Sequence, residues 1–234
     1  MPDPAPNPEL LRSLSRLVRG LSALFWGLPA ALIICVGTAS AGWFQTYGIV
    51  PPLVVNGLMV FGLWQIGAFQ KQERPWRDAL DRARLLALID FGLSPFLYWW
   101  NRLPEQPFFS AVLYVLAFSA MLFLFNLNLV LQRLGAMLPD ETLRHEIKQF
   151  TPVNRALLLA TLAFTILFIC SRFFPTLSAL DRLLVLPERN ALWWFLLLVL
   201  VPLAIFVLLP LAMTMALIWK TKEVILDSVF SAKS

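Results

Sequence analysis

The chain has 234 residues, of which 59% are hydrophobic and only 14% charged, and its formal net charge is +5 at pH 7. An ordinary soluble domain carries about 25% charged residues, so this chain has too few charged side chains to cover a soluble globule. We therefore expect an all-α integral membrane protein, whose basic residues mark cytoplasmic loops and do not indicate nucleic-acid binding.

Residues 1–20 predict a cytoplasmic tail that ends in an amphipathic helix. Four prolines within the first nine residues favour an extended tail, and residues 10–21 place leucines on one helical face and arginines on the other. Ala39-Ser40-Ala41 imitates the cleavage site of a signal peptide. However, the apolar stretch that begins at Leu21 is longer than the roughly 7–15 residues of a signal-peptide core. We therefore interpret it as a retained first span.

Long uncharged runs predict the spans, because a membrane helix needs about 20 mainly apolar residues. The run from residue 20 to 70 accommodates two spans joined by a tight turn near residues 44–47. The predicted spans are residues 21–43, 48–69, 84–101, 108–131, 155–174 and 192–219. Together they form one transmembrane domain over residues 21–219, which a cytoplasmic tail at 220–234 follows.

The third span is the uncertain one, because Asp90 interrupts it and Gly92 and Ser94-Pro95 follow. Five spans plus a re-entrant segment at 85–101 is therefore an alternative. A bundle of six spans places 15 of the 19 Lys and Arg residues on one side, whereas five spans place 12 there. Basic residues concentrate in cytoplasmic loops, so charge favours six spans in the inner cell (plasma) membrane, with both termini in the cytoplasm.

The loop after the fourth span predicts a second short interfacial helix. Asp140 is placed to cap its start, and Leu143, Ile147 and Phe150 fall on one face. We expect Thr151-Pro152 to end this helix before the fifth span. Residues 178–189 repeat the amphipathic pattern on a smaller scale outside the membrane.

Several polar residues fall at similar depth in the predicted spans. Depth along a helix follows from its rise of about 1.5 Å per residue. The candidate intramembrane polar layer comprises Asp90, Gln65, Asn126, Asn128, Ser94, Thr161 and Thr214. Buried carboxylates in membranes usually face the bundle interior, and amides on neighbouring helices are suitable donors to them. The layer is consistent with packing contacts between helices, with a functional site around Asp90, or with a re-entrant segment.

No motif for catalysis, metal binding or cofactor binding is present. The two cysteines, Cys35 and Cys170, lack C-x-x-C spacing and are interpreted as packing residues. We therefore expect no cofactor, and we favour a non-catalytic membrane subunit or scaffold over a membrane enzyme. The alternative is a small transporter, channel or lipid-handling protein that uses the layer around Asp90. Expected partners are the lipid bilayer and other membrane proteins or a second copy of the chain.

Overall fold

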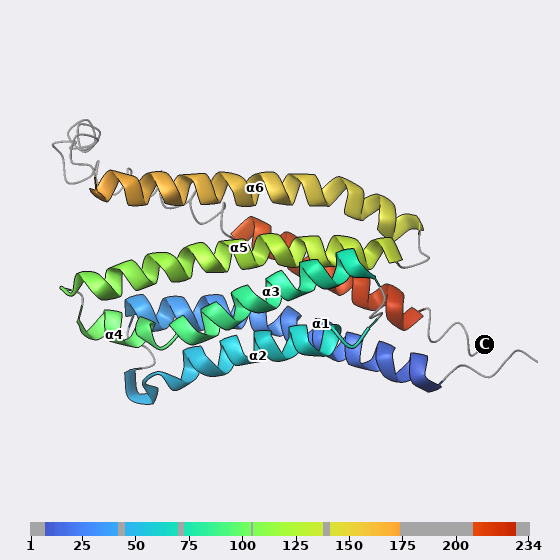
Figure 1. Ribbon diagram of the computed structural model, residues 1–234, viewed down its shortest axis with the longest axis horizontal. Coiled ribbons are helices and arrows are strands. Elements are labelled where there is room, and N and C mark those ends of the chain that lie inside the picture. The colour runs from blue at the N-terminus through green and yellow to red at the C-terminus, as the bar shows by residue number, and fades with distance from the viewer. Residues whose placement is uncertain are drawn as a thin grey trace, which may run out of the picture.

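The computed structural model describes residues 8–41, 45–69, 73–103, 105–137, 141–173 and 208–227 (Figure 1). Among them there is no β-strand, so this part of the chain is all-α, as the composition predicts. The helices are α1 (Pro8–Val36), α2 (Val50–Ile66), α3 (Arg74–Leu93), α4 (Phe96–Arg102), α5 (Pro107–Met137), α6 (Glu141–Phe173) and a helix over 208–227. A π-helical turn, η1 (Gly37–Ala41), extends α1, and a 3-10 turn, η2 (Gln45–Tyr47), precedes α2.

The long helices run in alternating directions along a common axis (Figure 1). α1 packs on α2, α2 on α3, α3 on α5, and α5 on α6. The 208–227 helix, red in Figure 1, contacts α1 through the Phe25 and Trp219 rings, whose centroids are 5.5 Å apart. The start of α1 and the end of the 208–227 helix therefore lie at the same end of the bundle.

α1 and α2 approach closely because two glycines face one another. A Cβ added at Gly20 would lie 2.7 Å from the backbone oxygen of Gly62, and one at Gly62 would lie 3.1 Å from the backbone oxygen of Gly20. Leu17, Leu21 and Leu24 are fully buried beside this contact. Small residues that let two backbones approach are typical of helix pairs in membranes.

The third predicted span consists of two helices, α3 and α4, separated by a bend at Ser94-Pro95. Pro95 has no N–H, so it cannot bond the carbonyl of Phe91 one turn earlier. The Ser94 hydroxyl donates to that carbonyl instead, at 2.8 Å. At the far end of α4, Asn101 Nδ2 donates to the Thr38 carbonyl in η1 at 2.8 Å. The combined segment thus extends from the loop after α2 to the end of the bundle where α1 terminates.

The two amphipathic segments expected as separate interfacial helices are continuous with longer helices. Residues 10–21 are the first turns of α1, and the segment after Asp140 is the first part of α6. The expectation that Thr151-Pro152 ends a helix is wrong, because Pro152 lies inside α6. One proline removes one backbone hydrogen bond and bends a helix without necessarily ending it. The amphipathic segment expected at 178–189 lies outside the described residues.

Two described helices are long and apolar enough to cross a membrane. They are Arg12–Ser40, with 29 residues and a mean hydropathy of 1.9, and Pro107–Met137, with 31 residues and a mean hydropathy of 2.3. α2 is apolar but has only 17 residues. The 208–227 helix continues beyond the predicted end of the sixth span at 219, and the earlier part of that span lies outside the described residues.

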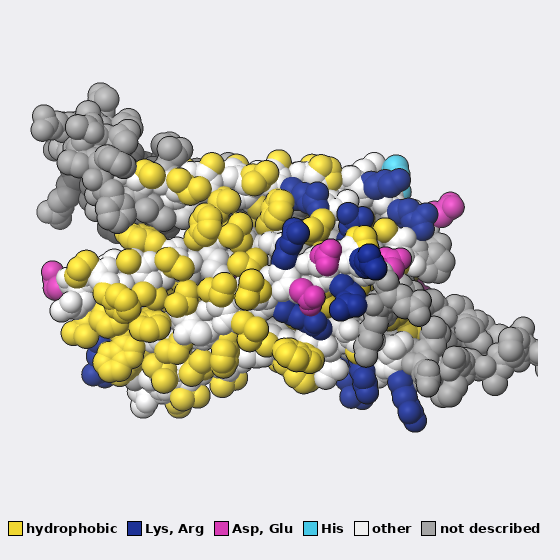
Figure 2. Space-filling model, in the orientation of Figure 1, with side chains coloured by type: hydrophobic (Ala, Val, Ile, Leu, Met, Phe, Trp, Pro, Cys, Tyr) yellow, Lys and Arg dark blue, Asp and Glu magenta, His cyan; other side chains and the backbone are white. Residues whose placement is uncertain are grey.

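Polar and apolar side chains are separated along the bundle axis (Figure 2). On the face shown, hydrophobic side chains cover the half that holds α4 and the start of α5. Lys and Arg gather over the other half, where α1 and α3 begin. Large apolar side chains remain exposed on several helices, including Trp26 at 68%, Val54 at 66% and Phe108 at 60%. The apolar half of the described surface therefore suits a lipid environment.

Candidate functional site

The residues of the predicted polar layer lie in three different places. Asn128 and Thr214 meet in the core, Asp90 lines a cavity, and Gln65 lines a hollow on the surface of α2. No hydrogen bond joins Asp90 to Gln65, Asn126 or Asn128 in the described part of the chain. Two distinct polar sites therefore replace the single layer.

The first site is an amide cluster formed by Asn128 of α5, Asn154 of α6 and Thr214 of the 208–227 helix. Asn128 Nδ2 donates to Thr214 Oγ1 at 3.0 Å, and Asn154 Nδ2 donates to Asn128 Oδ1 at 2.8 Å and to Thr214 Oγ1 at 3.2 Å. Thr214 Oγ1 in turn donates to the Pro210 carbonyl at 2.7 Å. All three side chains are buried. The amide cluster thus joins three helices through its donors, although the buried Asn154 Oδ1 accepts no hydrogen bond from the described residues.

Sequence reasoning missed Asn154, because it was assigned to the loop before the fifth span. Its burial follows from the continuity of α6, which carries Asn154 into the bundle core. The signal in the sequence is weak: Asn154 lies directly before Arg155 and only two residues before the uncharged run. The burial of Asn154 can be predicted only if the helix is assumed to continue through Pro152.

Three further members of the predicted layer bond mainly within their own helices. Asn126 Nδ2 donates to the Leu122 carbonyl, Ser94 Oγ to the Phe91 carbonyl and Thr161 Oγ1 to the Leu157 carbonyl, each at 2.8 Å. Such bonds to the preceding turn are common for short polar side chains in helices. These three contacts stabilise local backbone and do not point to a ligand.

The second site is centred on Asp90 of α3, whose side chain is only 5% exposed. Ser119 of α5 lies within interaction range of the carboxylate. Neither Asp90 Oδ1 nor Ser119 Oγ has a hydrogen-bond partner among the described residues. A buried carboxylate is destabilising by several kcal/mol in hydrocarbon unless it is paired, and at Asp90 Ser119 is the neighbouring hydroxyl while Oδ1 lacks a donor among the described residues. The buried Asp90 carboxylate is therefore suited to bind a ligand from outside the chain.

Asp90 lines a partly open cavity of about 310 Å³ between the helices. Residues of α1, α2, α3, α4, α5 and the 208–227 helix form its wall, and Asp90 is the one charged residue in the described lining. Most of the wall is apolar; its other polar side chains are Asn56 and Cys35. Asn56 Nδ2 donates to the Pro52 carbonyl at 2.9 Å and lies 3.6 Å from Cys35 Sγ.

This arrangement is suited to binding a small molecule. An ionised carboxylate only accepts hydrogen bonds, so it recognises a cation or a donor group. No group of three or more His, Cys, Asp or Glu side chains able to hold a metal ion occurs in the described part of the chain. The cavity therefore offers one charged contact in an otherwise apolar chamber, which is the usual composition of a small-molecule site.

Comparison with known proteins finds no matching family model, no similar curated protein and no similar solved structure.

Proposed function

We propose that the chain is a multi-pass membrane protein with six spans and both termini in the cytoplasm. Support comes from the two long apolar helices, the alternating helix directions and the gathering of Lys and Arg at one end (Figure 2). The bond between Asn101 and Thr38 favours a crossing of residues 84–101 over a re-entrant segment. A re-entrant segment would return to the end of the bundle where it entered.

Reporter fusions test this topology. Fusions at Lys233 and within residues 141–150 should behave as cytoplasmic, and fusions at Glu105 and Glu188 as exported, because the positive-inside rule assigns them so. A cytoplasmic result at Glu105 would reduce the number of spans to five and contradict the proposed crossing.

We further propose that the Asp90 cavity binds a small amphiphilic molecule with an apolar body and one cationic or hydrogen-bond-donating group. The observation that carries this proposal is the buried Asp90 Oδ1, which has no donor and lines an apolar cavity. A volume of about 310 Å³ equals that of about ten waters in the liquid, so the ligand is small. Such a site would suit a transport or lipid-handling protein, with the carboxylate as the anchor for the polar group.

A matched pair of probes tests the cavity. n-Octylamine and n-octanol have similar apolar bodies, but only the amine carries a positive charge. In detergent, octylamine at ten times its Kd should raise the Tm of the protein by about 3–5 °C, and octanol should raise it less. Asp90→Asn should abolish the preference for the amine, because an amide cannot neutralise the charge.

Asp78→Asn is the control, since Asp78 is an exposed carboxylate on the same helix. It should retain the full preference for the amine. An equal response to amine and alcohol in the parent, or an unchanged preference in Asp90→Asn, would remove the basis for a cation-binding cavity.

A non-catalytic membrane subunit or scaffold is the second candidate function. The amide cluster favours a scaffold, because its hydrogen bonds hold three helices of the chain together. This function predicts that native purification in mild detergent recovers a membrane protein in a fixed ratio to the chain, and that neither octylamine nor octanol stabilises it. Recovery of the chain alone, with a selective response to octylamine, would favour the binding function.

A further inference from the structure

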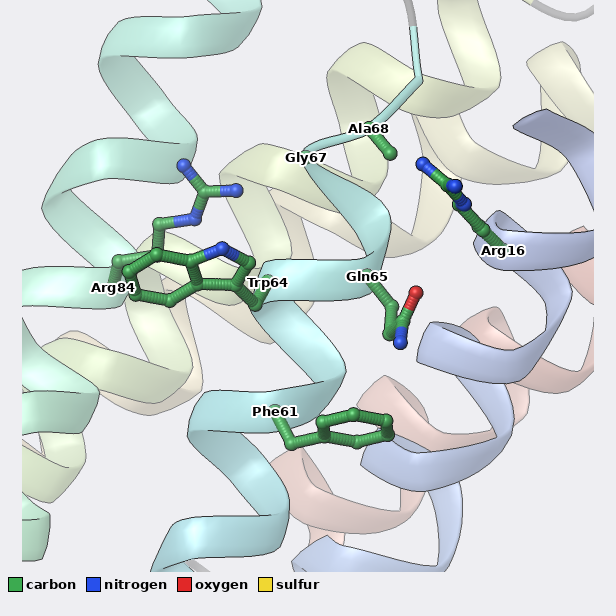
Figure 3. A pocket seen from close by; sticks show the side chains of 7 residues that line it. All are labelled: Arg16, Phe61, Trp64, Gln65, Gly67, Ala68 and Arg84. Carbon is green, nitrogen blue, oxygen red and sulfur yellow. The ribbon is translucent and has the colours of Figure 1, made fainter.

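A hollow of about 500 Å³ lies on the surface of the bundle at the C-terminal end of α2 (Figure 3). We call it the basic groove; its lining includes Arg16 of α1, Arg84 of α3, Phe61, Trp64 and Gln65 of α2, and Gly67 directly after α2. In Figure 3 the two arginines lie on opposite sides of α2. The basic groove is separate from the Asp90 cavity and shares no lining residue with it.

Arg84 is held in a fixed position at the end of α2. Its Nε and Nη2 donate to the Leu63 carbonyl at 3.4 and 3.3 Å, and Nη1 pairs with Asp81 at 3.2 Å. Its guanidinium lies 5.5 Å from the centre of the Trp64 ring. A Cβ at position 67 would overlap the guanidinium, so Gly67 provides the space for it. Arg84 thus offsets the negative end of the α2 dipole, which would otherwise repel an anion.

Arg16 supplies the second positive charge. It is exposed and forms no ion pair with any described residue. In Figure 3 the Gln65 side chain points toward α1, on the side of the groove where Arg16 lies. No carboxylate belongs to the described lining, although Asp81 pairs with Arg84 beside it. The open side of the groove therefore presents donors and positive charge, which suit a phosphate.

The surface next to the groove is apolar and follows one face of α2. Val54, Leu58 and Phe61 recur at i, i+4 and i+7 and are exposed by 66%, 36% and 51%. Trp64 is 64% exposed at the groove itself, and tryptophan is enriched at the depth of lipid headgroups. A ligand that fits both features has a phosphate joined to a long apolar chain.

We propose that the basic groove binds the phosphate of an anionic phospholipid, whose acyl chain lies along Val54, Leu58 and Phe61. The inference depends on the proposed membrane location and not on the ligand of the Asp90 cavity. Arg84 positions the end of α2, while Arg16, on the other side of that helix, is the group that contacts the phosphate.

The test uses the full-length protein in nanodiscs of phosphatidylcholine that contain a minor fraction of phosphatidylglycerol. Native mass spectrometry measures how much phosphatidylglycerol remains bound to the protein after release from the nanodisc. Arg16→Gln should weaken retention about fivefold, the effect of one positive charge near a membrane surface. Arg16→Lys should restore most of it. Arg82→Gln is the control, because it removes an exposed charge from α3 outside the groove.

Equal losses in Arg16→Gln and Arg82→Gln would overturn the inference, because general attraction to the membrane would then explain retention. Equal retention of phosphatidylglycerol and phosphatidylcholine by the parent would overturn it as well. Displacement by glycerol phosphate at a concentration comparable with the lipid would assign the groove to a soluble phosphate and contradict the lipid. Failure to enter nanodiscs at all would instead count against the membrane location.

Discussion

The amide cluster and Asp90 are both polar, both buried, and both placed between helices of one bundle, yet their surroundings differ. In the cluster, the amide donors of Asn128 and Asn154 and the hydroxyl of Thr214 all have acceptors within 3.2 Å. Asp90 Oδ1 has no donor and lines a cavity. A polar group in a membrane bundle therefore acts as a helix contact when the chain supplies its partner. When the chain leaves the partner out beside a cavity, as at Asp90 Oδ1, the same burial creates a binding position.

This difference has an energetic consequence. Hydrogen bonds between helices in a membrane contribute about 0.6 kcal/mol each on average and up to about 1.7 kcal/mol. The amide cluster stabilises the fold through several such bonds. Asp90 without a ligand destabilises it, because burial removes water from the carboxylate and no described group donates to Oδ1 in place of that water. Substitutions at the two sites should therefore change stability in opposite directions.

The largest effect is expected from Asn128→Leu. It removes one donor and one acceptor from the cluster and leaves an Asn154 donor less satisfied, which costs about 1–3 kcal/mol. The Tm in detergent should fall by about 3–10 °C. Asn126→Leu is the matched control, because Asn126 bonds the Leu122 carbonyl of its own helix and no other helix among the described residues. Equal losses of Tm in the two variants would show that the cluster does not hold the helices together.

Asp90→Leu should have an intermediate effect of opposite sign. Replacing a buried carboxylate whose Oδ1 has no donor with an apolar side chain removes its desolvation cost, so stability should rise by about 1–2 kcal/mol. Thermal unfolding in detergent without added ligand measures this change. A decrease similar to that of Asn128→Leu would mean that Asp90 has a partner within the folded protein, and the contrast between the two sites would disappear.

The smallest effect is expected from Ser94→Ala, which removes the hydroxyl that bonds the Phe91 carbonyl. That bond is local, so its loss should cost less than about 1 kcal/mol and lower the Tm by about 1–3 °C. Ser40→Ala is the control, because Ser40 also bonds the preceding turn but has no neighbouring proline. A loss in Ser94→Ala as large as that in Asn128→Leu would show that the bend matters more than the cluster.

Sequence reasoning reached the helical class and the burial of Asp90, but not its neighbours. Depth was counted from expected span ends, whereas α3 begins at Arg74 and the segment bends at Ser94-Pro95. Counting residues along a helix gives the depth of a side chain but not the direction in which it points. α2 is apolar around most of its circumference, so its sequence carries little signal for the face that meets α1. The contact between Gly20 and Gly62 determines which face of α2 packs on α1. This contact cannot be recognised until the positions of both helices are known.

The order of the amide cluster along the chain bears on how the protein is made. Asn128 and Asn154 are 26 residues apart, whereas Thr214 follows Asn154 by 60 residues. At about 5–20 residues per second, a ribosome completes Thr214 about 3–12 s after Asn154. Asn128 and Asn154 can therefore form their hydrogen bond before the 208–227 helix has been synthesised. That helix then packs against a pair that is already formed. The glycine contact between α1 and α2 needs no such delay, because both helices leave the ribosome first.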